Sequence, residues 1–107
     1  NTFKLKTKAN VGVTTVGIYT APAATTTVVI GITLANTSGA GVNVGVGITR
    51  AGATEDVKLL KNAPIPQGST LEFMGGNKVV LETTDTVTVD SDTNNSVDAA
   101  LTIMEIT

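Results

Sequence analysis

The 107-residue sequence contains no cysteine, no histidine and no tryptophan. These absences exclude disulfides, thiol nucleophiles, imidazole proton carriers and the ordinary kinds of zinc site. A chain of this length buries only about 65% of the surface that its unfolded form exposes, so its own core provides a thin margin of stability. Because neither disulfides nor zinc can add to that margin, we expect association with other subunits to contribute.

The sequence also lacks an excess of positive charge and a long apolar run. Its net charge is −2 and its pI is about 4.8, whereas a nucleic-acid-binding protein needs a basic face to displace counterions from phosphates, so we expect no nucleic-acid partner. The longest strongly apolar stretch, residues 28–35, is far shorter than the roughly 20 residues of a membrane-spanning helix, so no membrane span is expected. Residues 1–8 do not resemble a signal peptide, which predicts synthesis in a cytoplasm.

The feature that the sequence does contain is an apolar period of two. Bulky and small residues alternate over residues 28–35, 42–49 and 97–103, and helical spacing is absent almost everywhere. The abundant Val and Thr favour a pleated strand over a helix. We therefore predict an all-β protein, a single antiparallel β-sandwich domain over residues 1–107 that is jelly-roll-like and has about eight or nine short strands.

Turn-forming residues separate the predicted strands. Three segments rich in Gly, Asn or Ser, residues 36–41, 75–77 and 91–96, are predicted to be hairpin loops. Within residues 62–68, prolines flank Ile65 on both sides, and their missing amide donors and the extended geometry before them predict an ordered loop between the sheets.

The charges are distributed unevenly along the chain. Residues 1–8 hold three lysines and no acid, whereas every charged residue after Lys78 is acidic. We expect residues 1–8 to be an N-terminal arm or an edge strand that contacts an acidic surface of a neighbour and buries Phe3 and Leu5 there. Lysine on an edge strand also discourages unwanted strand pairing, which explains the same residues within a single chain.

Two predicted strands have a face of small residues that includes Gly31, Ala35, Gly45 and Gly47. Such a face allows another sheet or another subunit to approach closely, although glycine in a strand also marks local bends. The interface candidates in the N-terminal strand and the proline loop are Phe3, Lys4, Leu5, Lys6, Pro64, Ile65 and Pro66.

An oxygen-rich segment near the C-terminus has a spacing typical of a calcium loop. Asp90, Asp92, Asn94, Ser96 and Asp98 occur at every second position. The Gly at the sixth position and the Glu at the twelfth position of an EF-hand loop are both missing, and a polar hairpin with outward carboxylates explains the same residues. The calcium candidate is therefore incomplete, because it lacks the bidentate ligand that closes such a loop.

No convergent set of catalytic groups is visible. Glu55 and Asp56 are adjacent, so on a strand they point to opposite faces and cannot act on one substrate. We therefore expect no enzymatic activity and no cofactor. A carbohydrate-binding module is a different possibility, because β-sandwiches often carry sugar sites, but Phe3, Tyr19 and Phe73 are the only aromatic residues that could form a platform.

Five segments carry a resemblance over nearly the whole chain: YTAP at 19–22, VVIGITLAN at 28–36, KNAPIPQG at 61–68, KVVLETTD at 78–85 and EIT at 105–107. In this order they resemble small virion structural proteins of tailed bacteriophages. The resemblance implies a homo-oligomer, often a trimer, that decorates the capsid as a cement protein by bridging subunits of the major capsid protein. It equally allows a place at the neck, tail or fibres of the virion, and it carries over no catalytic residues.

Overall fold

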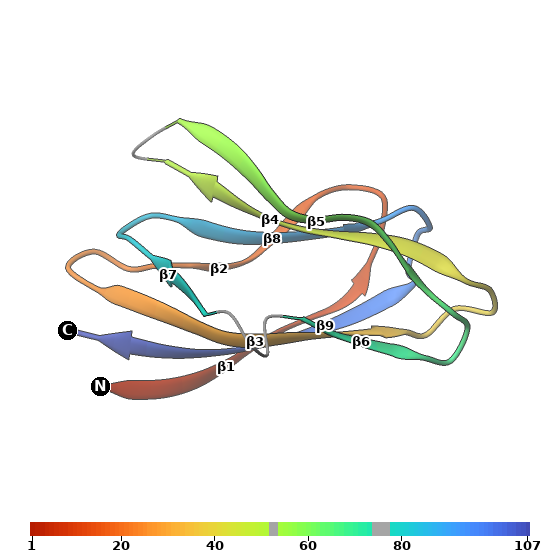
Figure 1. The fold of residues 1–107 in the computed structure, drawn as a ribbon, viewed down its shortest axis with the longest axis horizontal. Coiled ribbons are helices and arrows are strands. Elements are labelled where there is room, and N and C mark those ends of the chain that lie inside the picture. The colour runs from red at the N-terminus through yellow and green to blue at the C-terminus, as the bar shows by residue number, and fades with distance from the viewer. Residues whose placement is uncertain (52–53, 74–77) are drawn as a thin grey trace.

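The computed structural model describes residues 1–51, 54–73 and 78–107, and these residues form strands and turns without a helix. The nine strands are β1 (Thr2–Val11), β2 (Val16–Thr20), β3 (Thr26–Asn36), β4 (Val42–Arg50), β5 (Glu55–Ile65), β6 (Thr70–Phe73), β7 (Val79–Leu81), β8 (Thr86–Ser91) and β9 (Val97–Ile106). Figure 1 shows that they form two layers that face each other. The prediction of an all-β sandwich is confirmed.

All strand pairs are antiparallel, and the strands divide between two sheets. Sheet A has the order β1-β9-β3-β6, with β7 also paired to β3, and sheet B has the order β2-β8-β4-β5. Because β6 and β7 pair with successive parts of β3, they act as one interrupted strand. The described residues then form eight strands that repeatedly change sheets, which is the arrangement of a jelly roll.

The predicted hairpins are wrong in their strand pairing. Residues 36–41 lead from β3 in sheet A to β4 in sheet B, and residues 91–96 lead from β8 in sheet B to β9 in sheet A. Residues 75–77 lie outside the described residues, but the strands on either side, β6 and β7, both pair with β3. Alternation identifies a strand without specifying its partner, so a turn-rich segment between two strands can be a crossover as easily as a hairpin.

The proline segment is shorter as a loop than predicted. Strand β5 continues to Ile65, and Pro64 lies in it opposite Asn43 of β4. Because β5 is an edge strand, the missing amide hydrogen of Pro64 can face away from the sheet without loss of a ladder bond. The residues that follow cross from sheet B to β6 in sheet A, as the prediction of a loop between sheets requires.

A polar cluster links the two sheets beside the core. The Tyr19 hydroxyl of β2 donates to Oε2 of Glu105 at 2.7 Å and lies 2.8 Å from Oγ1 of Thr27. Oε1 of Glu105 pairs with Nζ of Lys4 at 2.9 Å. Burial raises the pKa of Tyr19 to about 12. The hydrogen bond from Tyr19, followed by that from Lys4, lowers the pKa of Glu105.

We expect the free energy of unfolding to fall between pH 10 and pH 12 because of Tyr19. Its pKa is about 12 in the folded chain against an ordinary value of 10.0, so the unfolded chain ionises first and stability present below pH 10 is lost as the pH rises. The loss from this group is at most about 1.4 kcal/mol per pH unit. Denaturant titrations of the wild type and Tyr19→Phe across this pH range separate the effect of Tyr19 ionisation from that of lysine deprotonation, because both proteins share the lysines. Parallel pH profiles would contradict the assignment.

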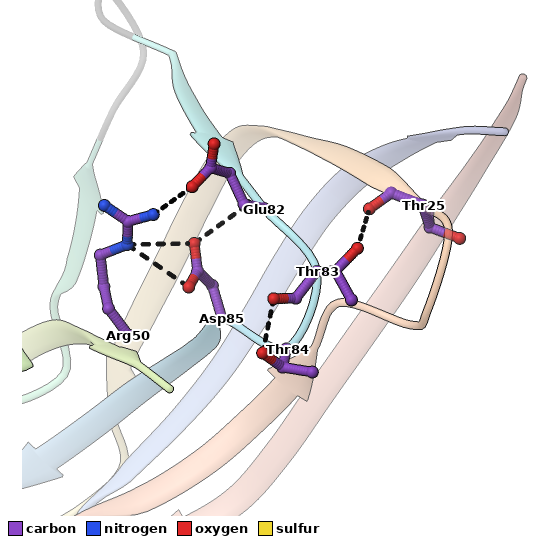
Figure 2. A network of polar contacts seen from close by, with 6 residues as sticks. All are labelled: Thr25, Arg50, Glu82, Thr83, Thr84 and Asp85. Atoms are coloured by element: carbon purple, nitrogen blue, oxygen red, sulfur yellow. Dashed lines mark hydrogen bonds and ion pairs between the residues drawn. The ribbon is translucent and has the colours of Figure 1, made fainter. Parts of the chain in front are cut away.

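A second polar group fixes the turn between β7 and β8 (Figure 2). The Asp85 side chain is buried, and its Oδ2 accepts a hydrogen bond from the backbone N–H of Glu82 at 2.9 Å. Nε of Arg50, at the end of β4, lies 3.4 Å from the same carboxylate, and Arg50 also pairs with Glu82. The backbone of Ala21 exchanges hydrogen bonds with this turn, so Asp85 organises a junction of three chain segments.

Asp85→Ala is expected to lower the free energy of unfolding by about 2–3 kcal/mol, because it leaves the backbone N–H of Glu82 and the Arg50 guanidinium without their shared, buried acceptor. Glu82→Ala removes the other carboxylate that binds Arg50, but Glu82 is exposed. We expect that change to cost less than about 1 kcal/mol, as for a surface ion pair. Denaturant unfolding of the two variants measures the difference, and similar losses would show that Asp85 has no special role.

Candidate functional site

The outer faces of the two sheets differ in chemistry. The outer face of sheet B is polar: Thr20 and Thr86 are hydrogen-bonded across β2 and β8 at 2.9 Å, and Asp90 accepts a hydrogen bond from Thr15 at 3.0 Å. The outer face of sheet A has few such contacts and many apolar side chains. This contrast marks sheet A as the candidate binding surface.

Four apolar side chains form a row across the outer face of sheet A. Phe3 on β1 is paired with Met104 on β9, and Val28 on β3 is paired with both Met104 and Val80 on β7. Residues paired in register share one face of a sheet. Phe3 is 70% exposed and Val80 is 57% exposed. Leu5, two residues after Phe3 on the same face, is 64% exposed. We call the row and Leu5 together the apolar end of the face: Phe3, Leu5, Val28, Val80 and Met104.

The same face is hollowed beyond the apolar end. A depression of about 330 Å³ is lined by Thr7, Lys8, Ala9, Thr33, Ala35, Asp98, Ala99 and Ala100. Thr7 is paired with Ala100, and Ala100 with Thr33, so β1, β9 and β3 form its floor. We call this part of the face the small-residue hollow. Bulky and small residues are therefore separated along the strands.

Exposed apolar side chains grouped in this way form a candidate binding surface. A folded chain usually scatters such residues singly, and contiguous patches of a few hundred Å² are commonly interaction sites. Each apolar side chain in the patch gains roughly 25 cal/mol for every Å² that a partner removes from water. The apolar end therefore gains stability when a partner covers it.

Residues 1–8 lie mostly in β1, which is an edge strand of sheet A. Lys4 is paired with Ile103 and Lys6 with Leu101, so both lysines are on the inner side of the sheet at its open edge. Lys4 forms an ion pair with Glu105 of its own chain. Inward-pointing charge at an edge discourages further strand pairing, which favours the single-chain explanation of these lysines.

The predicted interface residues lie in two different parts of the fold, the N-terminal strand and the proline segment. Phe3 and Leu5 lie on the exposed face described above, and Pro64 and Pro66 are exposed. Ile65 between them is 1% exposed and belongs to the core, so its prediction as an interface residue is wrong. It lies in the extended strand β5, where neighbouring side chains point to opposite sides and a composition-based prediction cannot tell which side is buried.

The small face of sheet B is covered by the chain itself, so the prediction is wrong there, whereas for sheet A it stays a prediction. An added Cβ at Gly45 would lie 2.5 Å from Oδ1 of Asp90, and one at Gly47 would lie 2.8 Å from the carbonyl oxygen of Val57. The chain's own atoms therefore fill that space. At Gly31 the nearest atom to an added Cβ is 3.7 Å away, and the position borders the open face of sheet A.

The calcium candidate residues do not converge. Asp90 lies on the outer face of sheet B, whereas Asp98 is on sheet A and accepts a backbone N–H of β1 at 3.0 Å. Asp92 and Asn94 each accept a backbone N–H from a different segment, and Ser96 is buried. Within the described ranges no group of three or more His, Cys, Asp or Glu side chains is placed to hold a metal ion. The segment with the alternate spacing includes the crossover from β8 to β9, so its side-chain oxygens lie on different sheets.

The three aromatic residues do not form a sugar-binding platform. Tyr19 is 7% exposed and is hydrogen-bonded in the interior, and Phe73 packs against the core. Phe3 is exposed without another aromatic residue beside it, since its neighbour in register is Met104. A carbohydrate-binding module with stacked aromatic side chains is therefore not supported by this surface.

Comparison with known proteins identifies a related fold. No protein-family model and no curated protein matches the chain. A solved structure reported with the words "Bacillus endospore appendages form a novel family of disulfide-linked pili" matches with a TM-score of 0.52 and 18% sequence identity, over 99% of this chain and 88% of that one. At this identity the match shows a shared β-sandwich fold.

None of the described residues forms a helix long and apolar enough to cross a membrane. The candidate contact residues of the apolar end were only partly predicted from the sequence. Phe3 and Leu5 were predicted from the N-terminal strand, but Val28, Val80 and Met104 were not, because they come from three other strands. Their common face follows from the register alone.

Proposed function

We propose that this chain is a structural subunit of a larger protein assembly and that the outer face of sheet A is its contact surface. The observation that carries the proposal is the exposed apolar end, where Phe3, Leu5 and Val80 are each more than half exposed. On the opposite outer face, that of sheet B, Thr20 is hydrogen-bonded to Thr86, and Asp90 accepts a hydrogen bond from Thr15. A partner that covers sheet A therefore removes apolar surface from water without breaking internal hydrogen bonds.

We further propose that the assembly is a bacteriophage virion and that the chain decorates the capsid as a cement protein. The five segments that resemble virion structural proteins, together with the jelly-roll fold, support this role. A protein that binds neighbouring coat subunits stabilises the closed shell, since opening the shell also requires breaking its contacts. A place at the neck, tail or fibres is the alternative within the virion.

A second candidate function is a subunit of a pilus-like filament. The fold similarity to the endospore appendage structure favours it. That family is described as disulfide-linked, whereas these 107 residues contain no cysteine. A filament built from these residues would therefore rely on noncovalent contacts between their faces.

The role in a virion is tested by the copy number of the chain in purified particles, measured by quantitative peptide mass spectrometry against the major coat protein. A number comparable with the coat protein supports capsid decoration, and a few copies per particle support the neck, tail or fibres. Absence from particles overturns the virion role and leaves the filament as the candidate.

The contact surface is tested by thiol labelling, because the 107 residues contain no native cysteine. In assembled material Leu5→Cys is expected to react at least several-fold more slowly with a maleimide than in the free protein. Thr49→Cys serves as the control, since Thr49 is exposed and is paired with Thr86 on the outer face of sheet B. Equal labelling of Leu5→Cys in the assembled and free protein would show that this face is not a contact.

A further inference from the structure

We infer that the partner at the outer face of sheet A is a second copy of this chain, stacked face to face about a twofold axis. The axis lies midway between sheet A of one copy and sheet A of the other, and it runs perpendicular to the strands. This inference rests on the proposed function, because it identifies what covers the contact surface proposed there. It is argued from the distribution of side-chain size along the face.

The face consists of successive rows of paired residues. The first row contains Phe3 and Met104, and the next contains Leu5 and Thr102. Thr7 and Ala100 follow, and beyond them the small-residue hollow continues to its far end. Side-chain volume therefore falls from one end of the face to the other, with the change between the second and third rows.

A twofold rotation about an axis between the second and third rows exchanges the two ends. It places Phe3 of one copy over Ala9 of the other, and Val28 over Ala35. Near the axis it places Leu5 over Thr7. Phe3, Leu5 and Val28 then face small residues, whereas Met104 on β9 faces Asp98. With three of these bulky side chains opposite small ones, the two sheets can approach to the roughly 10 Å at which β-sheets pack face to face.

Other symmetries fit the face less well. A twofold axis parallel to the strands would place the apolar end on the apolar end and leave the two hollows opposite each other. A threefold arrangement, such as the trimer that the virion resemblance implies, joins one patch to a different patch on the next copy. The outer face of sheet A carries both complementary halves itself, which is the property that an isologous pair requires.

The size of the face is sufficient for a weak, reversible dimer. With four strand positions about 4.8 Å apart and roughly nine residues at 3.3 Å each, the face covers about 600 Å² per copy. Two copies therefore bury on the order of 1,200 Å², which is at the lower limit for specific interfaces and above most crystal contacts. The carboxylate of Glu72 lies on β6 at the side of the face, where it can stay in contact with water. The carboxylate of Asp98, opposite Met104 in the pair, keeps the hydrogen bond from the backbone N–H of Asn10.

Sedimentation equilibrium of the purified chain tests the inference. The wild type is expected to show a concentration-dependent monomer–dimer equilibrium, and Leu5→Asp is expected to raise the dissociation constant at least 10-fold. Thr49→Asp is the matched control and should leave the constant unchanged, since it adds the same charge to an exposed position on the outer face of sheet B. Circular dichroism confirms that both variants are folded.

A wild type that stays monomeric at every concentration, a trimer, or a dimer insensitive to Leu5→Asp would each overturn the inference. If Leu5→Cys is nevertheless protected in assembled material, the face binds a different protein, and the proposed function survives without the dimer. If that protection is also absent, both fail. The two measurements therefore distinguish failure of the dimer from failure of the function.

Cross-linking tests the direction of the axis. In the proposed pair, Phe3→Cys of one copy faces Ala9→Cys of the other, whereas two Phe3→Cys residues are about 20 Å apart along the strands. A short bismaleimide applied to a mixture of the two single variants, one carrying an affinity tag, should give mixed dimers several-fold in excess of like pairs. Equal yields of mixed and like cross-linked dimers would overturn this geometry. So would the absence of any cross-linked dimer in a mixture that sedimentation shows to be dimeric.

Discussion

Leu101→Ala is expected to lower the free energy of unfolding by about 2–5 kcal/mol, as for other large-to-small changes in a core. Leu101 is 0% exposed on β9, which is hydrogen-bonded on one side to β1 and on the other to β3. Both neighbouring strands hold the backbone in place, so the structure has little freedom to close the cavity that the lost methyl groups leave. Denaturant unfolding measures the change.

Leu5→Ala is the control for Leu101→Ala because it removes the same atoms from the neighbouring strand of the same sheet. Leu5 is 64% exposed, so we expect a change within about 0.5 kcal/mol when the protein is dilute enough to be monomeric. If the two variants lost similar stability, the assignment of the inner and outer faces of sheet A would be wrong.

Asn36→Asp is expected to lower the free energy of unfolding by at least about 3 kcal/mol, although the two side chains have nearly the same shape. Asn36 is 4% exposed, and its Nδ2 donates to the carbonyl oxygens of Ala40, Ile65 and Pro66 at 2.8, 3.0 and 3.3 Å. An ionised Asp has no hydrogen to donate and places a negative charge against these oxygens. The two crossovers between the sheets would lose their common anchor.

The destabilisation of Asn36→Asp should diminish at low pH, where the protonated carboxyl recovers one donor and loses its charge. Asn95→Asp is the control, because Asn95 is exposed in the loop before β9. It should change stability by less than about 0.5 kcal/mol. Thermal unfolding of both variants at neutral and acidic pH checks the prediction, which a pH-independent loss at Asn36 would contradict.

The importance of Asn36 illustrates the limit of the sequence-based prediction. In the sequence it begins a turn-rich segment that was predicted to be a hairpin loop. In the structure its side chain reaches Ile65 and Pro66, which are 29 and 30 residues away along the chain. Turn propensity indicates where a strand ends, but it contains no information about which distant segment supplies the next hydrogen-bond partner.

The candidate sites show the same limit: one could be predicted from the sequence and the other could not. The exposed apolar residues of β1 could be predicted because Phe3 and Leu5 are close together in the sequence and alternate with lysines. The oxygen-rich segment from Asp90 to Asp98 had an equally regular spacing, yet the crossover between β8 and β9 places its two ends on different sheets. Spacing predicts a common site only while the chain remains in one element.

The sequence by itself determined that this protein is all-β, because the apolar period of two and the abundance of β-branched residues are local properties that fix the conformation of each strand. It did not determine which strands are neighbours, since alternation assigns two faces to every strand and leaves its partners open. The tertiary structure alone decided that Val28, Val80 and Met104 lie beside Phe3 on one exposed face. It also decided that Gly45 is covered from within, because strand register brings together residues that no local pattern connects.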